Sequence, residues 1–266
     1  MSSRRKRTGK IGDMASDALP GGQTTLRERK KQQTRSELIE TALECFAGEG
    51  FSNTTLEALC DRVQVSKRTF FRYFTSKEDV ALAPGHDLWR QFLMELEVAE
   101  PDGRPLFALS VDAMHRALSL VDFGGWSSRL LRSYELAERT PSMRASGLEF
   151  CATTAEVAAE ILHRNFAIDQ DDEIYVQLGT ELFTVAVRHA LSAWALACSS
   201  ACSSACSSAR SSTRSSAGSS AGPEAASARP PGKGLHEYLD EAVAALPAGL
   251  SVTAPGRPPG KQPASF

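Results

Sequence analysis

Between residues 62 and 77 the chain carries five basic side chains and no acidic one: Arg62, Lys67, Arg68, Arg72 and Lys77. Guanidinium and ammonium groups at this density suit a phosphate backbone, and arginine also reads base edges through paired hydrogen bonds. The alternative is a solvated basic face on a small helical bundle. The caps and apolar residues around the window favour recognition of DNA.

A short helix, a tight turn and a second helix are predicted to present these basic residues. Thr54-x-x-Glu57 is a capping box, which predicts the start of the first helix. The apolar positions of this helix are Leu56, Leu59, Cys60 and Val63. After the turn Val63-Gln64-Val65, Ser66 is expected to cap the second helix. This order is the helix-turn-helix arrangement, in which the second helix enters the major groove.

The second helix is expected to divide its side chains between a core and the DNA. Phe70 and Phe74, four residues apart, are expected to face inward. Side chains at the start of the helix reach base edges, whereas those around it hold phosphates and fix the register. The residues predicted to contact DNA in these ways are Thr54, Thr55, Ser66, Lys67, Arg68, Thr69, Phe71, Arg72, Tyr73 and Lys77.

Helical patterns account for most of the remaining chain. From Leu26 to Ala47 apolar residues recur three or four positions apart, and Gly48-Glu49-Gly50 is expected to end that helix. Ser76-x-x-Asp79 opens a fourth helix, which Pro84-Gly85 is expected to kink or interrupt. Further helices follow between residues 105 and 197, and no segment alternates with the period of a strand. We therefore expect an all-α fold.

Charge divides the chain into a basic N-terminal part and an acidic remainder. Residues 1–80 contain 15 Lys/Arg and 11 Asp/Glu, whereas the rest contains 15 and 21. A basic end on an acidic body suits a protein that meets a polyanion at one end only. The parts that we predict are a disordered basic tail (1–25), a DNA-binding domain (26–80), a helical regulatory and dimerisation domain (81–250) and a disordered tail (251–266).

Six tandem tetrads interrupt the larger domain. Their first residues are Cys198, Cys202, Cys206, Arg210, Arg214 and Gly218, and each is followed by Ser-Ser-Ala or Ser-Ser-Thr. A tract with so little to bury predicts a flexible low-complexity insertion over residues 198–234, after a long helix that ends near Trp194. The alternative is a metal or redox site, because the three cysteines would share one helix face, but no fourth ligand stands in register.

Several of these motifs are similar to those of the TetR/AcrR family of transcriptional regulators. They are Thr54-Thr55-Leu56, Val65-Ser66, Thr69 through Phe74, and Ser76-Lys77-Glu78. The resemblance implies a three-helix DNA-binding domain and a larger domain that binds a small effector. It also implies a homodimer formed through Ile174–Ala197 and Leu235–Leu246. The chain departs from the family at Gln64, where the turn usually holds a glycine.

The resemblance implies a repressor that a small hydrophobic or acyl-type effector releases from a pseudo-palindromic operator. Large side chains between residues 100 and 195 are candidates for the effector pocket, although most such residues form cores. These candidates are Phe107, His115, Phe123, Trp126, Tyr134, Phe183 and Trp194. The segment from Arg129 to Arg144 resembles the mycofactocin-regulator-like branch, which hints at an acyl-CoA. A DNA-binding protein without any effector is the rival interpretation.

Other classes of function find little support in the sequence. No nucleophile elbow, zinc-protease motif, P-loop or dinucleotide-binding glycine motif is present, and the five histidines show no metal-ligand spacing. We therefore expect no enzymatic activity, no cofactor and no metal. With no apolar run near 18 residues and no secretory leader, we expect a cytoplasmic protein without a membrane partner.

Overall fold

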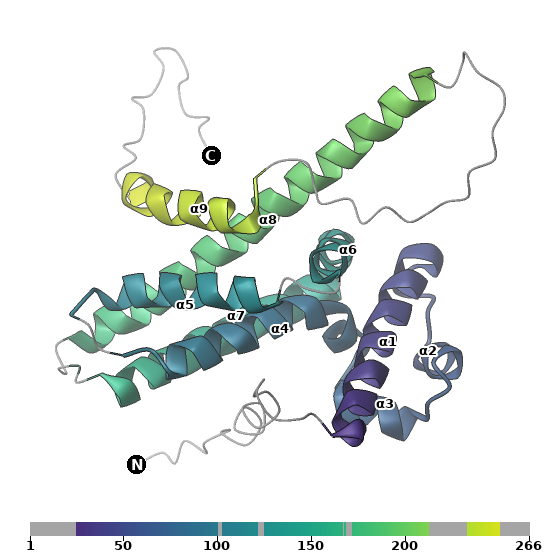
Figure 1. Cartoon of the computed structure of the whole chain (residues 1–266), viewed down its shortest axis with the longest axis horizontal. Coiled ribbons are helices and arrows are strands. Elements are labelled where there is room, and N and C mark those ends of the chain that lie inside the picture. Colours follow the sequence, from purple (N-terminus) through teal and green to yellow (C-terminus); the bar gives the residue numbers. More distant parts are fainter. Residues whose placement is uncertain are drawn as a thin grey trace, which may run out of the picture.

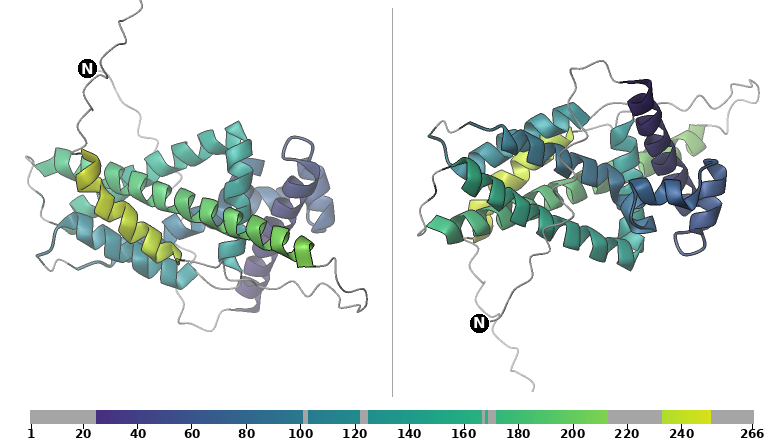
Figure 2. Two further views of the ribbon diagram at one scale, coloured as in Figure 1. Left: turned by 90° about the horizontal axis from the view of Figure 1, so that it is seen from above. Right: turned by 90° about the horizontal axis from the view of Figure 1, so that it is seen from below.

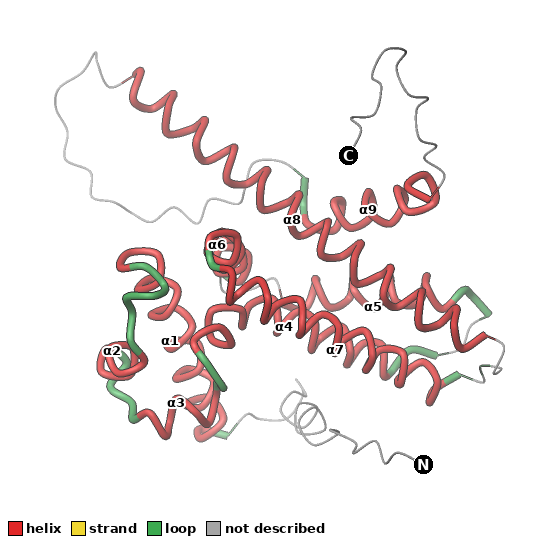
Figure 3. Tube along the Cα trace, turned by 180° about the vertical axis from the view of Figure 1, so that it is seen from behind, coloured by secondary structure: helices red, strands yellow, loops and turns green. Residues whose placement is uncertain are grey.

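The computed structural model of the 266-residue chain describes residues 25–100, 103–121, 125–166, 168, 172–212 and 233–250. The helices are α1 (Leu26–Glu49), α2 (Leu56–Arg62), α3 (Lys67–Tyr73), α4 (Lys77–Glu97), α5 (Leu106–Val121), α6 (Trp126–Arg139), α7 (Pro141–Asn165), α8 (Glu173–Ser212) and α9 (Leu235–Leu250). Among these residues no strand occurs (Figure 3), which confirms the all-α prediction. Both predicted terminal tails lie outside the described residues, except for Thr25, which caps α1.

Helices α1–α3 gather at one end of the molecule (Figures 1 and 2). Phe70 and Phe74 are buried among them, as predicted, with ring centroids 5.7 Å apart. Ser66 caps α3 by accepting a hydrogen bond from the amide of Thr69, and Ser76 caps α4 in the same way. One cap is shifted, because Thr55, and not Thr54, accepts from the amide of the third residue of α2.

The larger part of the chain is a helical body built around α4. Helix α4 packs against α5, α6 and α7, and α8 packs against α7 and α9 (Figure 1). The core of this body includes Trp89 and Phe92 of α4, Met114 of α5 and Phe183 of α8. Through these contacts, α4 touches most of the helices that could form an effector site.

Two hydrophobic cores meet within α4. The core of the N-terminal end includes α4 as far as Ala83, and the core of the body begins at Leu88. Met143, at the start of α7, is fully buried in the N-terminal core. The residues of α4 from Pro84 to Asp87 therefore lie between the two cores, and α7 touches both.

Pro84 lies inside α4, which continues through it, so of the two predicted outcomes, a kink or an interruption, the interruption is wrong. Proline has no N–H and leaves the carbonyl of Val80 without its usual intrahelical donor. Two buried side chains of α6 donate to nearby α4 carbonyls. Ser133 Oγ donates to the oxygen of Ala81 (2.6 Å), and Trp126 Nε1 donates to that of Pro84 (2.9 Å). These bonds hold α6 against the proline segment.

Helix α8 is longer than predicted, because it continues past Trp194 as far as Ser212. The first tetrads are therefore helical and not a flexible linker. Alanine favours helix, and a helix that has already formed extends at little cost where glycine and proline are absent. Cys198 lies in the core of the body, and Ser199 Oγ donates to Glu135 Oε1 (2.6 Å). The predicted insertion beyond residue 212 lies largely outside the described residues.

Within α8, the segment Glu173–Ala201 is long and apolar enough to cross a membrane by composition alone. Half of its most apolar stretch is buried inside the protein, where it packs against α7 and α9. A core helix of a folded body has the same composition, so we interpret α8 as a core helix whose outer face is apolar.

Candidate DNA-binding surface and effector cavity

The turn between α2 and α3 sets the direction of the second helix. Val65 N donates to Cys60 O (2.9 Å), and Gln64 N donates to Asp61 O (3.2 Å). Gln64 has a φ of 56°, a left-handed conformation that costs about 1–2 kcal/mol for a residue other than glycine. The position where a glycine is usual therefore has the backbone that favours glycine.

The start of α3 presents polar and basic side chains to solvent. Arg68 and Lys67 are exposed, and within the described part of the chain no hydrogen bond or ion pair engages Arg68. Lys67 forms an ion pair with Glu57 of α2, and the hydrogen bond from Lys67 lowers the pKa of that carboxyl. Arg68 is thus the unpartnered cation at the position from which a recognition helix reads bases.

Further along α3, two aromatic residues and an arginine lie on the surface. Phe71 is exposed and packs edge-on against Phe70. The guanidinium of Arg72 lies over the ring of Tyr73, 5.1 Å from its centroid, and donates to its hydroxyl (3.2 Å). Arg72 and Tyr73 therefore form one polar unit at the end of the helix, where phosphate contacts were predicted.

Two residues predicted to hold phosphates have a structural role instead. The side chain of Thr54 is 1% exposed and donates to Gly50 O (3.0 Å), so its hydroxyl cannot reach DNA. Lys77 Nζ donates to the carbonyl oxygens of Phe51 and Thr54, each 2.9 Å away. Both corrections have the same cause, because the loop after α1 leaves carbonyls that need donors.

Ion pairs between distant residues connect the N-terminal end to the body, and sequence reasoning missed them. Arg35 of α1 forms paired hydrogen bonds with Asp87 of α4, at 2.9 and 2.7 Å. Arg132 of α6 forms an ion pair with Glu40 of α1. The partners are 52 and 92 residues apart in sequence, so no helical spacing could have indicated them.

A mostly apolar cavity of about 450 Å³ lies between the two cores. Its walls come from α4, α6, α7 and α8, and include Leu82, Trp89, Tyr134, Met143 and Val185. Leu82 and Met143 pack with the N-terminal core, whereas Trp89 belongs to the core of the body. A molecule in this cavity would therefore touch both cores at once.

The most unusual side chain on the wall of this cavity is His86. It is 7% exposed and stacks on Phe150, with ring centroids 3.8 Å apart. Its Nδ1 lies 3.3 Å from Asp79 Oδ1, near enough for an ion pair but without the alignment of a hydrogen bond. Neither ring nitrogen has a hydrogen-bond partner among the described residues. Burial lowers the pKa of His86, although the Asp79 carboxylate opposes that shift.

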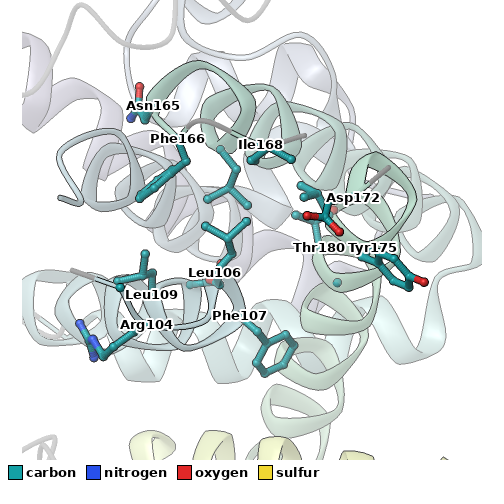
Figure 4. A pocket seen from close by; sticks show the side chains of 15 residues that line it. Arg104, Leu106, Phe107, Leu109, Asn165, Phe166, Ile168, Asp172, Tyr175 and Thr180 are labelled. Carbon is teal, nitrogen blue, oxygen red and sulfur yellow. The ribbon is translucent and has the colours of Figure 1, made fainter. Parts of the chain in front are cut away.

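A second cavity, of about 620 Å³, lies between α5, the end of α7 and the start of α8 (Figure 4). Its walls include Leu106, Phe107, Phe166 and Ile168, together with polar residues such as Asp172. No residue of α4 or α6 lines it. A ligand there would lie away from the contacts that join the body to the N-terminal end.

The seven candidates for the effector pocket do not share one cavity. Tyr134 lines the smaller cavity and Phe107 the larger one. Trp126, Phe183 and Trp194 are buried in the core of the body and line neither cavity. Phe123 lies outside the described residues. The correction follows from size, because large aromatic side chains fill cores more often than they line pockets.

His115 is the remaining candidate for the effector pocket, and it connects α5 to α9. Its Nδ1 lies 2.8 Å from Nδ1 of His236, and its Nε2 lies 2.9 Å from Asp240 Oδ1. The two imidazoles stack nearly parallel. His115 lines neither of the two cavities, so its role is to hold α9 against the body.

The outer face of α8 carries a stripe of exposed apolar side chains. Its large members are Ile174, Leu178, Leu182 and Val185. They recur three or four residues apart, so they share one side of the helix. Val185 also lines the smaller cavity, as do Arg188 and His189 one turn further on. The stripe therefore borders the cavity.

Comparison with known proteins agrees with this architecture. Residues 38–83 match the family of bacterial regulatory proteins described as the tetR family. The HTH-type transcriptional regulator TcmR of Streptomyces glaucescens is 35% identical over 175 residues, which cover 64% of this chain and 77% of that protein. The HTH-type transcriptional repressor AcnR of Corynebacterium diphtheriae is 28% identical over 154 residues, covering 57% and 76%.

These similarities confirm the predicted family and the predicted class of function. The mycofactocin-regulator-like branch and the acyl-CoA find no support in them and stay predictions. The similarities to known proteins, together with the helix-turn-helix and the all-helical body, identify the chain as a transcriptional regulator that belongs to the TetR family of bacterial regulatory proteins.

Proposed function

We propose that the protein is a cytoplasmic, ligand-responsive repressor. As a homodimer it binds a pseudo-palindromic operator, from which a small hydrophobic effector releases it. One observation carries the effector part of this proposal: the cavity of about 450 Å³ is bordered by α4 and α6, the two helices that α1 contacts through ion pairs. A ligand there could favour one arrangement of α4 over another, through its different affinity for the two. No enzymatic activity is proposed.

On the DNA side, we propose that Arg68 reads a base, with Lys67 and Thr69 beside it. Thr55, Ser66, Phe71, Arg72 and Tyr73 would contact the backbone or adjacent sugars around the recognition helix. The exposure of the start of α3 supports this assignment, as does the guanidinium of Arg68, which has no partner among the described residues. A single short helix buries little DNA surface, so a specific site needs two of them, related by the two-fold axis of a dimer.

The apolar stripe on α8 is the face that we propose for the dimer, and α9 would contribute its own outer face. Four large side chains exposed in a row on one helix form a patch that a monomer rarely leaves in water. Because Val185 and His189 also line the smaller cavity, the second subunit would cover one side of the effector. Dimerisation and effector binding would then depend on each other.

The test combines oligomeric state with binding to the protein's own promoter DNA. Replacing both Leu182 and Val185 by Asp is expected to give monomers that lose operator binding. The control is Leu120→Asp, an exposed apolar residue of α5 outside the stripe, which should remain dimeric. Dimers in the double variant would place the interface elsewhere. Failure of hydrophobic metabolites to release the wild-type protein would favour a DNA-binding protein without an effector.

A further inference from the structure

The charge and burial around His86 define which atoms of its ring can bind a ligand. Burial by itself would raise the pKa of Asp79, but His86 and hydrogen bonds from Thr75 lower it to about 2, so the carboxylate is ionised at neutral pH. Burial also favours the neutral form of His86. A neutral imidazole beside a carboxylate carries its proton on the nearer nitrogen, which is Nδ1.

In that tautomer Nε2 of His86 has a lone pair and no proton. This nitrogen is buried, and it has no donor within the described part of the chain. A buried acceptor left without a donor costs about 1–3 kcal/mol. His86 lines the smaller cavity, but Nε2 itself has almost no accessible surface, so a ligand in that cavity supplies the missing donor only when the imidazole turns toward it. Most of the remaining wall is apolar, although Glu138, Arg144 and Arg188 also line it, so the larger part of that ligand is expected to be apolar.

The groups beyond His86 lead to the end of the recognition helix. Asp79, whose carboxylate faces Nδ1 of His86, accepts hydrogen bonds from the amide and the hydroxyl of Thr75, at 2.8 and 3.0 Å. Thr75 stands two residues after Tyr73, the last residue of α3. A change in the position of His86 would therefore act on a carboxylate that fixes the loop between α3 and α4.

We propose that the effector is an apolar molecule carrying a hydroxyl or N–H group, and that this group donates a hydrogen bond to Nε2 of His86. His86 is then the residue that distinguishes effectors from other apolar molecules. The same contact alters the interaction of His86 with Asp79, through which the α3–α4 loop senses the ligand. This inference rests on the proposed effector function of the smaller cavity and adds the chemistry of the ligand to it.

The experiment compares two probes that differ in one hydrogen-bond donor, using the full-length protein. 2-Naphthol can donate to Nε2, whereas 2-methoxynaphthalene has the same rings and cannot. Calorimetric titration at neutral pH should show about tenfold tighter binding of the naphthol to the wild-type protein, the usual effect of one such bond. In His86→Leu this preference should vanish, and His86→Gln, whose amide oxygen accepts, should retain part of it.

A matched control makes the same change at a histidine outside the cavity. His163→Leu removes an exposed imidazole from α7, and the preference for the naphthol should remain. If His86→Leu does not fold, ¹⁵N-imidazole spectra of the wild-type protein give a second reading. The naphthol should shift the Nε2 resonance of one histidine, identified by its loss in His86→Gln, and the methyl ether should not.

Equal affinity for the two probes, binding of neither, or a preference that persists in His86→Leu would each overturn the proposal. Operator binding in the absence of any probe is measured in parallel. If the wild-type protein does not bind the operator, the proposed repressor function is contradicted. If it binds the operator but shows no preference between the two probes, only the role of His86 is contradicted.

Discussion

The ammonium group of Lys77 donates a hydrogen bond to the carbonyl oxygen of Thr54, 2.9 Å away. The same group donates to Phe51 O and lies over the ring of Phe51, 4.7 Å from its centroid. One cation at the start of α4 thus holds the loop between α1 and α2. Its contribution to DNA binding is expected to be indirect, through the position of α2 and α3.

Lys77→Met is expected to lower the free energy of unfolding by about 2 kcal/mol, because two part-buried carbonyls lose a charged donor. Chemical denaturation followed by circular dichroism measures this change. Arg72→Ala is the control: this exposed arginine contacts only Tyr73 among the described residues, and should change stability by less than about 0.5 kcal/mol. Unchanged stability in Lys77→Met, together with a weaker salt dependence of DNA binding, would restore the phosphate role.

Arg68→Ala is expected to weaken operator binding by about 1–3 kcal/mol while leaving non-specific binding nearly unchanged, as expected for an arginine that reads a guanine. Fluorescence anisotropy with operator and scrambled DNA, at several salt concentrations, separates the two effects. Because Arg68 is exposed and unpaired within the described residues, its loss should not affect folding. Equal losses on both DNAs would show that Arg68 holds a phosphate.

Local sequence signals predicted the DNA-binding end well. Ser66 and Ser76 precede their helices as caps, and the spacing of Phe70 and Phe74 indicated their burial. Such features depend on residues three or four positions apart, which a sequence displays directly. The sequence could not show which of Thr54 and Thr55 caps α2. In the structure Thr54 is turned inward by its hydrogen bond to the carbonyl oxygen of Gly50.

The effector cavity could not be predicted in the same way. Its walls come from four helices that are separated in the sequence. In the sequence His86 is an isolated histidine, and only the fold places Asp79 and Phe150 beside it. The large side chains of Trp126 and Phe183 made them candidates for the pocket, but both are buried in the core of the body. The prediction of a flexible tract at the first tetrads was wrong for a related reason. A segment with little apolar surface can still continue a helix whose preceding turns are packed in a core.

Gln64→Gly is expected to raise the free energy of unfolding by about 0.5–1 kcal/mol. Glycine adopts the φ of 56° without strain, and this gain exceeds the added entropy of the unfolded chain. Gln64 is exposed, so the substitution tests the backbone alone. Gln64→Ala should be nearly neutral, and Gln64→Val should be destabilising because a β-branched residue tolerates this conformation least. Equal stability of the three variants would show that the turn carries no strain.

Asp79→Asn is expected to lower stability by about 2 kcal/mol at neutral pH. Burial would raise the pKa of Asp79, but its hydrogen bonds and His86 lower it to about 2 from a value near 3.8. A carboxyl with a lowered folded-state pKa stabilises the fold above its unfolded pKa, and this stability is lost as the pH falls toward 2. Urea unfolding between pH 7 and pH 3 should therefore show the two proteins converging. The exposed carboxylate variant Asp61→Asn should show no such convergence.

Pro84→Ala is expected to weaken the response to effector more than it changes operator affinity. The proline lies between the two cores, and α6 holds this segment through Trp126 and Ser133. Alanine restores the amide donor to the carbonyl of Val80 and so stiffens the helix at the point where it can bend. A stiffer α4 should move less when a ligand fills the cavity beside it.

Operator affinity with and without an effector, in the wild type and in Pro84→Ala, measures this coupling. A second reading needs no effector: amide hydrogen exchange in α4 near residue 84 should be slower in the variant, because the added hydrogen bond must break before exchange occurs. The control is Gly48→Ala on α1, where an added methyl group meets no atom within 4 Å and which does not line the cavity, so both readings should stay as in the wild type. An unchanged ratio of affinities in Pro84→Ala would mean that the proline shapes α4 without taking part in the switch.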